Sequence, residues 1–156
     1  MTMDAILHLL HQALFGGIAA MGFGVLFNFG FRLLPWCGAA GALALAVRTL
    51  GLDDGWSLEA ATFAAAIVTS CSASVLRRAL GPVCNAVALA GCIPMVPGAF
   101  FGQALLSFFA LTAPNPVNAD QTIVLAIEYI LRVIFTLGAI GAGLAIPAHL
   151  LKNREF

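Results

Sequence analysis

Five long apolar runs, joined by short polar segments, take up most of the chain: residues 5–27, 33–50, 58–76, 83–111 and 121–151. A membrane-spanning helix needs about 20 mainly apolar residues to cross a hydrocarbon core that is about 30 Å thick. The apolar residues are continuous and do not alternate with polar ones, which argues against the strands of a transmembrane β-barrel. We therefore predict an all-α, polytopic membrane protein with five transmembrane helices, in which residues 1–156 form a single transmembrane domain and no soluble domain.

The composition agrees with this prediction and excludes other classes of protein. Apolar residues make up 62% of the 156 residues and charged residues only 9%, whereas soluble domains contain about 45–50% and about 25%. A soluble domain of this size buries only about 70% of the surface of its unfolded chain, which is too little to hide so many apolar side chains. The scarcity of charge also excludes a disordered chain and a nucleic-acid-binding protein.

The charged residues between the apolar runs predict how the chain lies in the membrane. On one side, the loops and the C-terminal tail carry five basic residues: Arg32, Arg77, Arg78, Lys152 and Arg154. The segments on the other side carry acidic residues and no lysine or arginine. Because basic residues collect on the cytoplasmic side of a membrane, we predict an N-terminus outside the cytoplasm and a cytoplasmic C-terminus.

The fourth run contains the sequence Ile-Pro-Met-Val-Pro-Gly at residues 93–98, which predicts a broken helix. Pro94 and Pro97 lack an N–H donor and clash with the preceding turn, and Gly98 adds backbone freedom. The rise of a helix from Val83 puts the break about 16–21 Å into the membrane, near its middle. Irregular backbone at that depth has to be buried in protein or line a polar cavity. A half-helix beginning near Pro97 would offer free N–H groups to an anion such as a substrate carboxylate; a plain proline kink without a ligand is the alternative.

Four polar residues in or beside the first three runs are further candidates for a transport path. Arg48 lies near the outer end of its run, where it either lines the outer mouth for an anionic substrate or extends to the membrane surface. Asn28 either turns the chain at the end of the first run or offers its amide to the path. Thr69 and Ser70 can hydrogen-bond to their own helix, or they can line a polar path.

Glu128 and Arg132 are spaced four residues apart in the fifth run, in the order that favours an ion pair on a helix. An ion pair inside a membrane indicates a functional site. However, residues 133–151 are long enough to cross the membrane alone, which would leave the pair at the outer interface. Both interpretations stay open from the sequence.

Motifs for catalysis, nucleotide binding and metal binding do not occur in the sequence. HExxH, GxSxG and P-loop patterns are absent, and the four cysteines are not spaced like zinc ligands. We therefore predict that the protein is not an enzyme and that it carries no metal or other cofactor.

Several segments together resemble one known family of membrane proteins. They are residues 23–28 (FGVLFN) with Arg32, residues 36–38 (WCG), Arg48, the sequence at residues 93–98, and residues 144–147 (LAIP). On these segments the chain resembles the threonine/serine exporter (ThrE) family, in its short, split form, from about residue 22 to residue 152. The sequence at residues 93–98 is the most specific of them.

The resemblance implies a function that the physical pattern alone does not give. In split systems of this family, a larger membrane subunit supplies a soluble N-terminal domain and five further spans, and the pair exports a hydroxy amino acid or a dicarboxylate resembling succinate. The resemblance also implies a bacterial inner membrane and transport coupled to the proton gradient. It implies functional roles for Asn28, Arg48, Pro94, Pro97 and Gly98.

Combining these arguments, we predict a membrane subunit of a two-component secondary exporter of small metabolites that carry a carboxylate. The substrate carboxylate would lie near the start of the half-helix after Pro97, and Arg48 would add positive potential. The alternatives are a membrane scaffold that does not transport and, less well supported, a homo-oligomeric channel. The expected partners are the larger subunit, a small organic acid or hydroxy amino acid, and the lipid bilayer; no nucleic acid is expected.

Overall fold

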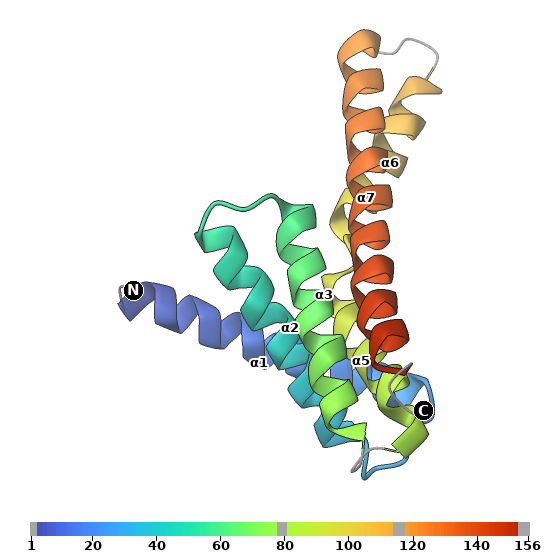
Figure 1. Cartoon of the computed structure of the whole chain (residues 1–156). Coiled ribbons are helices and arrows are strands. Elements are labelled where there is room, and N and C mark those ends of the chain that lie inside the picture. The colour runs from blue at the N-terminus through green and yellow to red at the C-terminus, as the bar shows by residue number, and fades with distance from the viewer. Residues whose placement is uncertain (1–2, 78–80, 114–117, 153–156) are drawn as a thin grey trace. The chain divides into compact units, whose positions relative to one another are not determined.

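The computed structural model describes residues 3–77, 81–113 and 118–152, and these residues form helices and turns without a strand (Figure 1). The α-helices within these ranges are α1 (Met3–Leu26), α2 (Leu34–Asp53), α3 (Leu58–Val75), α5 (Cys84–Cys92), α6 (Gly98–Leu111) and α7 (Ala119–Lys152). Two short 3₁₀ turns, η1 (Gly81–Val83) and η2 (Ile93–Met95), flank α5. The prediction of an all-α fold is confirmed.

The helices follow the apolar runs of the sequence closely. Four of them, α1, α2, α3 and α7, are long and apolar enough to cross a membrane, and the helical segments on either side of residues 96–97 make a fifth candidate if they count as one broken span. The exact number of spans and the orientation of the termini stay predictions. Two of the basic residues that support this orientation, Arg78 and Arg154, lie outside the described residues.

The outer surfaces of the helices are apolar, as expected for contact with lipid. Large side chains such as Leu14 on α1, Phe109 on α6 and Phe135 on α7 are all more than half exposed. A soluble protein rarely exposes contiguous apolar surface of this kind. The exposed apolar side chains therefore support a multi-pass membrane protein.

The chain divides into two compact units, each described here by itself. The first unit contains residues 1–95 and 139–156, and the second contains residues 96–138. The first therefore holds α1, α2, α3, α5, η2 and the C-terminal part of α7. The second holds α6 and the N-terminal part of α7.

Small residues bring the helices of the first unit into close contact. A Cβ atom on Gly16 of α1 would lie 2.6 Å from the Leu45 side chain and 3.0 Å from the carbonyl oxygen of Gly41 on α2. A Cβ atom on Gly91 of α5 would lie 2.6 Å from the Cβ of Ala40. Helices in membranes associate largely by van der Waals packing, and glycine allows their backbones to approach closely.

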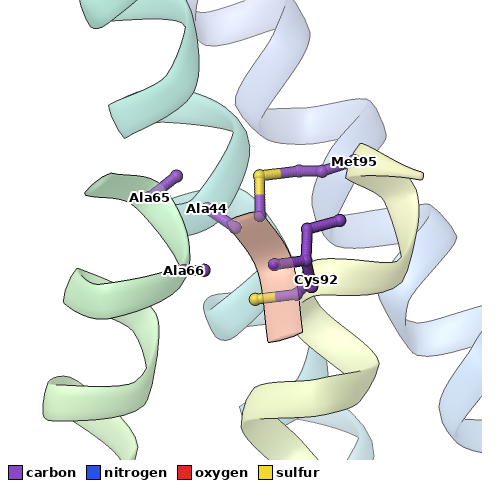
Figure 2. Packing of buried hydrophobic residues seen from close by; sticks show 6 residues of the cluster. Ala44, Ala65, Ala66, Cys92 and Met95 are labelled. Carbon is purple, nitrogen blue, oxygen red and sulfur yellow. The ribbon is translucent and has the colours of Figure 1, made fainter. Parts of the chain in front are cut away.

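One core cluster of the first unit lies where α2, α3, α5 and η2 meet. Its buried residues include Ala44, Ala65, Ala66, Cys92 and Met95, and Figure 2 shows the side chains of Cys92 and Met95 directed toward the alanines of the neighbouring helices. Met95 is the bulkiest side chain among them and is fully buried. The end of the helical segment before the break is therefore anchored in a core of small residues.

Residues at the helix ends explain where two of the helices begin. Pro35 lies in the first turn of α2, where a missing N–H costs no helical hydrogen bond. Ser57 precedes α3, and its Oγ accepts a hydrogen bond from the backbone N–H of Ala60 at 3.2 Å, which is a typical N-cap. Gly55, in the loop before it, has a φ of +83° that favours glycine.

Candidate functional site

The helix of the fourth apolar run breaks at the predicted position. α5 ends at Cys92, η2 continues to Met95, and α6 begins at Gly98. Between them, Pro97 has φ −81° and ψ 63°, and the N–H of Gly98 donates to the carbonyl oxygen of Val96 at 2.8 Å. These values define an inverse γ-turn centred on Pro97. The prediction that a straight helix cannot pass through this sequence is confirmed.

The first turn of α6 offers two backbone donors. Within the first turn of α6, the N–H of Phe101 donates to the carbonyl oxygen of Pro97 at 3.2 Å. In the described part of the chain, no acceptor pairs with the N–H groups of Ala99 and Phe100. Such donors at a helix N-terminus carry a partial positive charge. Gly98 and Ala99 are also exposed, so the start of α6 is open to a ligand.

Arg48 contacts the last residue before the break. Its half-buried guanidinium donates from Nη1 to the backbone carbonyl oxygen of Met95, at 3.1 Å. In a continuous helix, that carbonyl would accept the N–H of Ala99. At the break, the carbonyl oxygen of Met95 instead accepts a hydrogen bond from Arg48. The N–H of Ala99 therefore lacks the acceptor that it would have in a continuous helix. Sequence reasoning did not connect Arg48 with Met95, because no spacing rule relates residues that lie on different helices.

The positive charge of Arg48 is not balanced by an acidic side chain within the described ranges of the chain. A guanidinium has five N–H donors, and the hydrogen bond to Met95 uses one of them. A charged group in an apolar span is costly unless it is paired. Arg48 is therefore suited to binding an anion while the carbonyl of Met95 holds it in place.

Asn28 forms the C-terminal cap of α1. It has a φ of 58°, its N–H donates to the carbonyl oxygen of Val25, and the N–H of Phe29 donates to that of Gly24, both at 2.9 Å. This is a Schellman motif with asparagine in the left-handed position. Asn28 therefore turns the chain at the end of α1. Its side chain is exposed, and its role in transport stays a prediction.

Thr69 and Ser70 are both buried on α3, and both hydroxyls bond to backbone carbonyls. Thr69 donates to Ala65 of its own helix at 2.8 Å, whereas Ser70 donates to Leu144 of α7 at 3.1 Å. Ser70 and Asn85 also lie beside a cleft of about 290 Å³ between α3, α5 and the C-terminal part of α7. Ser70 therefore joins two helices, and a polar path along α3 stays a prediction.

Glu128 and Arg132 form the predicted ion pair, in the second unit. Arg132 donates from Nε and Nη2 to Oε1 of Glu128, at 3.1 and 3.0 Å. The side chains of Arg132 and Glu128 are 42% and 49% exposed. The guanidinium carbon of Arg132 lies 5.6 Å from the ring centroid of Phe100, and this ring stacks with Tyr129 at 6.0 Å. We call these four residues the Arg132 cluster.

Two residues of the site were not predicted from the sequence. Phe100 lies in the first turn of α6 and contacts Arg132. Thr136 is 0% exposed, and its hydroxyl has no hydrogen-bond partner among the described residues. The spacing of Thr136, four residues after Arg132, was the available signal, since it places both on one face of a helix.

The remaining candidates for chemistry do not come together. In the described part of the chain, no three His, Cys, Asp or Glu side chains are grouped so that they could hold a metal ion. The four cysteines are free thiols; Cys37, Cys84 and Cys92 are buried and Cys71 is half-buried. Cys37, Cys84 and Cys92 belong to the packed clusters between helices.

The long apolar helices, the packing by small residues and the break in one candidate span indicate a multi-pass helical membrane protein. A comparison with protein families agrees: the model of the threonine/serine exporter family, ThrE, matches residues 12–150. The chain therefore belongs to the threonine/serine exporter family, whose members are membrane exporters and not enzymes. No solved structure matches this chain.

Proposed function

We propose that this chain is the membrane subunit of a two-component secondary exporter of small metabolites that carry a carboxylate, such as threonine, serine or a dicarboxylate resembling succinate. The substrate carboxylate binds the N–H groups in the first turn of α6, after Pro97. Arg48 supplies positive potential on the transport path. Rocking against the partner subunit provides alternating access.

One interrupted hydrogen bond gives the strongest support to this proposal. Arg48 occupies the carbonyl of Met95, and the N–H of Ala99 has no acceptor within the described chain. A backbone donor in an apolar span must be satisfied by protein, water or a ligand. A small anion is a suitable ligand, since helix N-termini attract negative charge.

The partner and the location follow from the predicted topology and the family. Five spans place the two ends of the chain on opposite sides of the membrane. A larger subunit that supplies a soluble N-terminal domain and five spans of opposite topology would complete an inverted repeat, which is the usual basis of alternating access. We propose that the pair lies in the bacterial inner membrane and that the proton gradient drives export.

Export from lipid vesicles tests the proposal directly. The chain and the larger subunit are reconstituted together, and release of labelled threonine, serine and succinate is measured with and without a proton gradient. We expect Arg48→Ala to lower export about tenfold or more, because it removes the positive charge near the break. We expect a similar loss for Pro97→Ala, because helical hydrogen bonds can then form across the break and occupy N–H groups that would otherwise bind the substrate.

Pro35→Ala is the matched control. Pro35 also lies in a first helical turn, but far along the sequence from the break, and we expect this variant to export at the wild-type rate. If Pro97→Ala and Arg48→Ala also insert normally and export at the wild-type rate, the proposed site is wrong. If the intact pair assembles but exports none of the three substrates, the scaffold interpretation replaces the exporter.

A further inference from the structure

The hydroxyl of Thr136 on α7 is bonded differently from those of Thr62, Thr69 and Thr122. Thr62 and Thr69 on α3 donate their hydroxyls to the carbonyl oxygens four residues earlier, at 2.6 and 2.8 Å. Thr122, on the same helix as Thr136, does the same at 3.1 Å. This bond to the preceding turn is the usual way to satisfy a hydroxyl in a helix. Thr136 is fully buried and does not make it, nor does its Oγ1 have another partner in the described ranges.

Thr136 lies on the face of α7 that contacts the start of α6. Tyr129 and Arg132 on this face both contact the ring of Phe100, in the first turn of α6. Thr136 follows them by seven and four residues, which keeps it on the same face. Figure 1 shows α6 and this part of α7 running side by side in opposite directions. Thr136 therefore lies about 6 Å beyond Arg132 along α7, toward the N-terminal end of α6.

Helix geometry therefore puts several hydrogen-bond donors toward the same end of α6. The first turn contributes the N–H groups of Ala99 and Phe100, which have no acceptor in the described chain. Arg132 directs two of its N–H groups to a single oxygen of Glu128, and its other donors remain available. Thr136 adds a hydroxyl that is buried and unpaired. A carboxylate is the small ligand that accepts from amide, hydroxyl and guanidinium donors together.

We propose that Thr136 is a substrate-binding residue, whose hydroxyl completes, with Arg132, a subsite for the substrate carboxylate at the first turn of α6. This inference rests on the proposed function and names the residues of the second unit that serve it. Glu128 positions the guanidinium of Arg132 through their ion pair. The buried, unpaired hydroxyl is thereby explained as a donor that is satisfied when substrate is bound.

The first experiment separates binding from turnover by measuring threonine export from vesicles that contain the intact pair of subunits. Thr136→Val keeps the shape of the side chain and removes the hydroxyl. We expect about a tenfold or greater rise in KM, since a hydrogen bond to a charged group is lost. Thr136→Ser should restore the wild-type KM. Thr122→Val is the matched control, because its hydroxyl is already paired, and its KM should not change.

The second experiment measures the melting temperature of the purified protein with and without threonine. Removing a buried hydroxyl that lacks a partner relieves a desolvation cost, so Thr136→Val should melt at or above the wild-type temperature without threonine. The stabilisation that threonine gives the wild-type protein should shrink in this variant. A purely structural threonine would give the opposite pattern, a lower melting temperature with an unchanged response to threonine.

Two outcomes overturn this inference without touching the proposed function. One is a Thr136→Val variant whose KM and response to threonine equal those of the wild-type protein while the wild-type pair exports normally. The other is an equal rise in KM for Thr136→Val and Thr122→Val, which would indicate a general effect on α7. If the wild-type pair does not export threonine, serine or succinate at all, the proposed function fails instead.

Discussion

Two arginines lie beside the broken helix, and their surroundings differ. Arg48 is half-buried in the first unit, donates to the backbone carbonyl of Met95, and has no acidic partner in the described chain. Arg132 lies in the second unit, is 42% exposed, and is paired with Glu128 and placed over the ring of Phe100. The same side chain is therefore uncompensated in one unit and neutralised by a neighbour in the other.

This difference extends to the packing around each arginine. The helices around Arg48 meet through small residues, and α5 packs so closely on α2 that a Cβ atom on Gly91 would lie within 3.0 Å of backbone atoms. On α6, beside the Arg132 cluster, a Cβ atom on Gly102 would meet nothing within 4 Å. The comparison teaches that α5, before the break, is tightly packed at Gly91, whereas α6, after the break, has open space beside Gly102.

The largest effect is expected from filling the two glycine positions. Gly91→Leu would force α5 away from the backbone of α2, and overpacking of this kind should destabilise the protein by about 3 kcal/mol or more. Gly102→Leu adds a side chain where there is open space and replaces a poor helix former, so we expect unchanged or slightly higher stability. Thermal denaturation in detergent measures both. Equal losses of stability in the two variants would contradict the contrast between a tightly packed and an open position.

A smaller effect, on export alone, should distinguish the two arginines. Arg48→Met and Arg132→Met each keep a long side chain and remove a charge. Both variants should export more slowly than the wild-type protein. The loss should be larger for Arg48→Met, about tenfold or more, because a guanidinium without an acidic partner contributes its full charge to binding an anion. Export is measured per inserted protein in vesicles that contain both subunits.

Replacing Glu128 by the uncharged Gln tests the comparison of the two arginines further. In Arg132→Met, the carboxylate of Glu128 is left unpaired and repels the substrate, so the double variant Glu128→Gln/Arg132→Met should recover part of the lost export. The same change at Glu128 should not rescue Arg48→Met, since Arg48 has no acidic partner within the described ranges. Rescue of both arginine variants by Glu128→Gln would show that the two charges act as one system.

Much of the fold was predictable from the sequence, because the membrane imposes one simple rule on it. A helix of about 20 apolar residues is the usual way to cross a bilayer, so the apolar runs predicted the helices to within a few residues of α1, α2 and α3. The break was predictable for a similar reason, since Pro94 and Pro97 remove backbone donors whatever surrounds them.

The contacts between helices were not predictable in the same way. Arg48 pairs with a backbone carbonyl of another helix, and a carbonyl group has no signature in the sequence. The spacing of Glu128 and Arg132 did predict their ion pair, because both lie on one helix. Thr136 was missed because a threonine in a helix normally bonds to its own backbone, and the exception becomes visible only when the partners are known.

The smallest expected effect is the coupling between Glu128 and Arg132 themselves. A double-mutant cycle with Glu128→Gln and Arg132→Gln should give a coupling of about 0.2–1 kcal/mol in thermal or denaturant unfolding, because both side chains are more than two-fifths exposed and solvent screens them. Raising the salt concentration should reduce it further if the pair faces water. A coupling of several kcal/mol that salt does not change would place the pair inside the hydrocarbon region, where each charge left alone is costly. This measurement therefore decides between the two positions of the pair that the sequence left open, and with them how deep in the membrane the second arginine works.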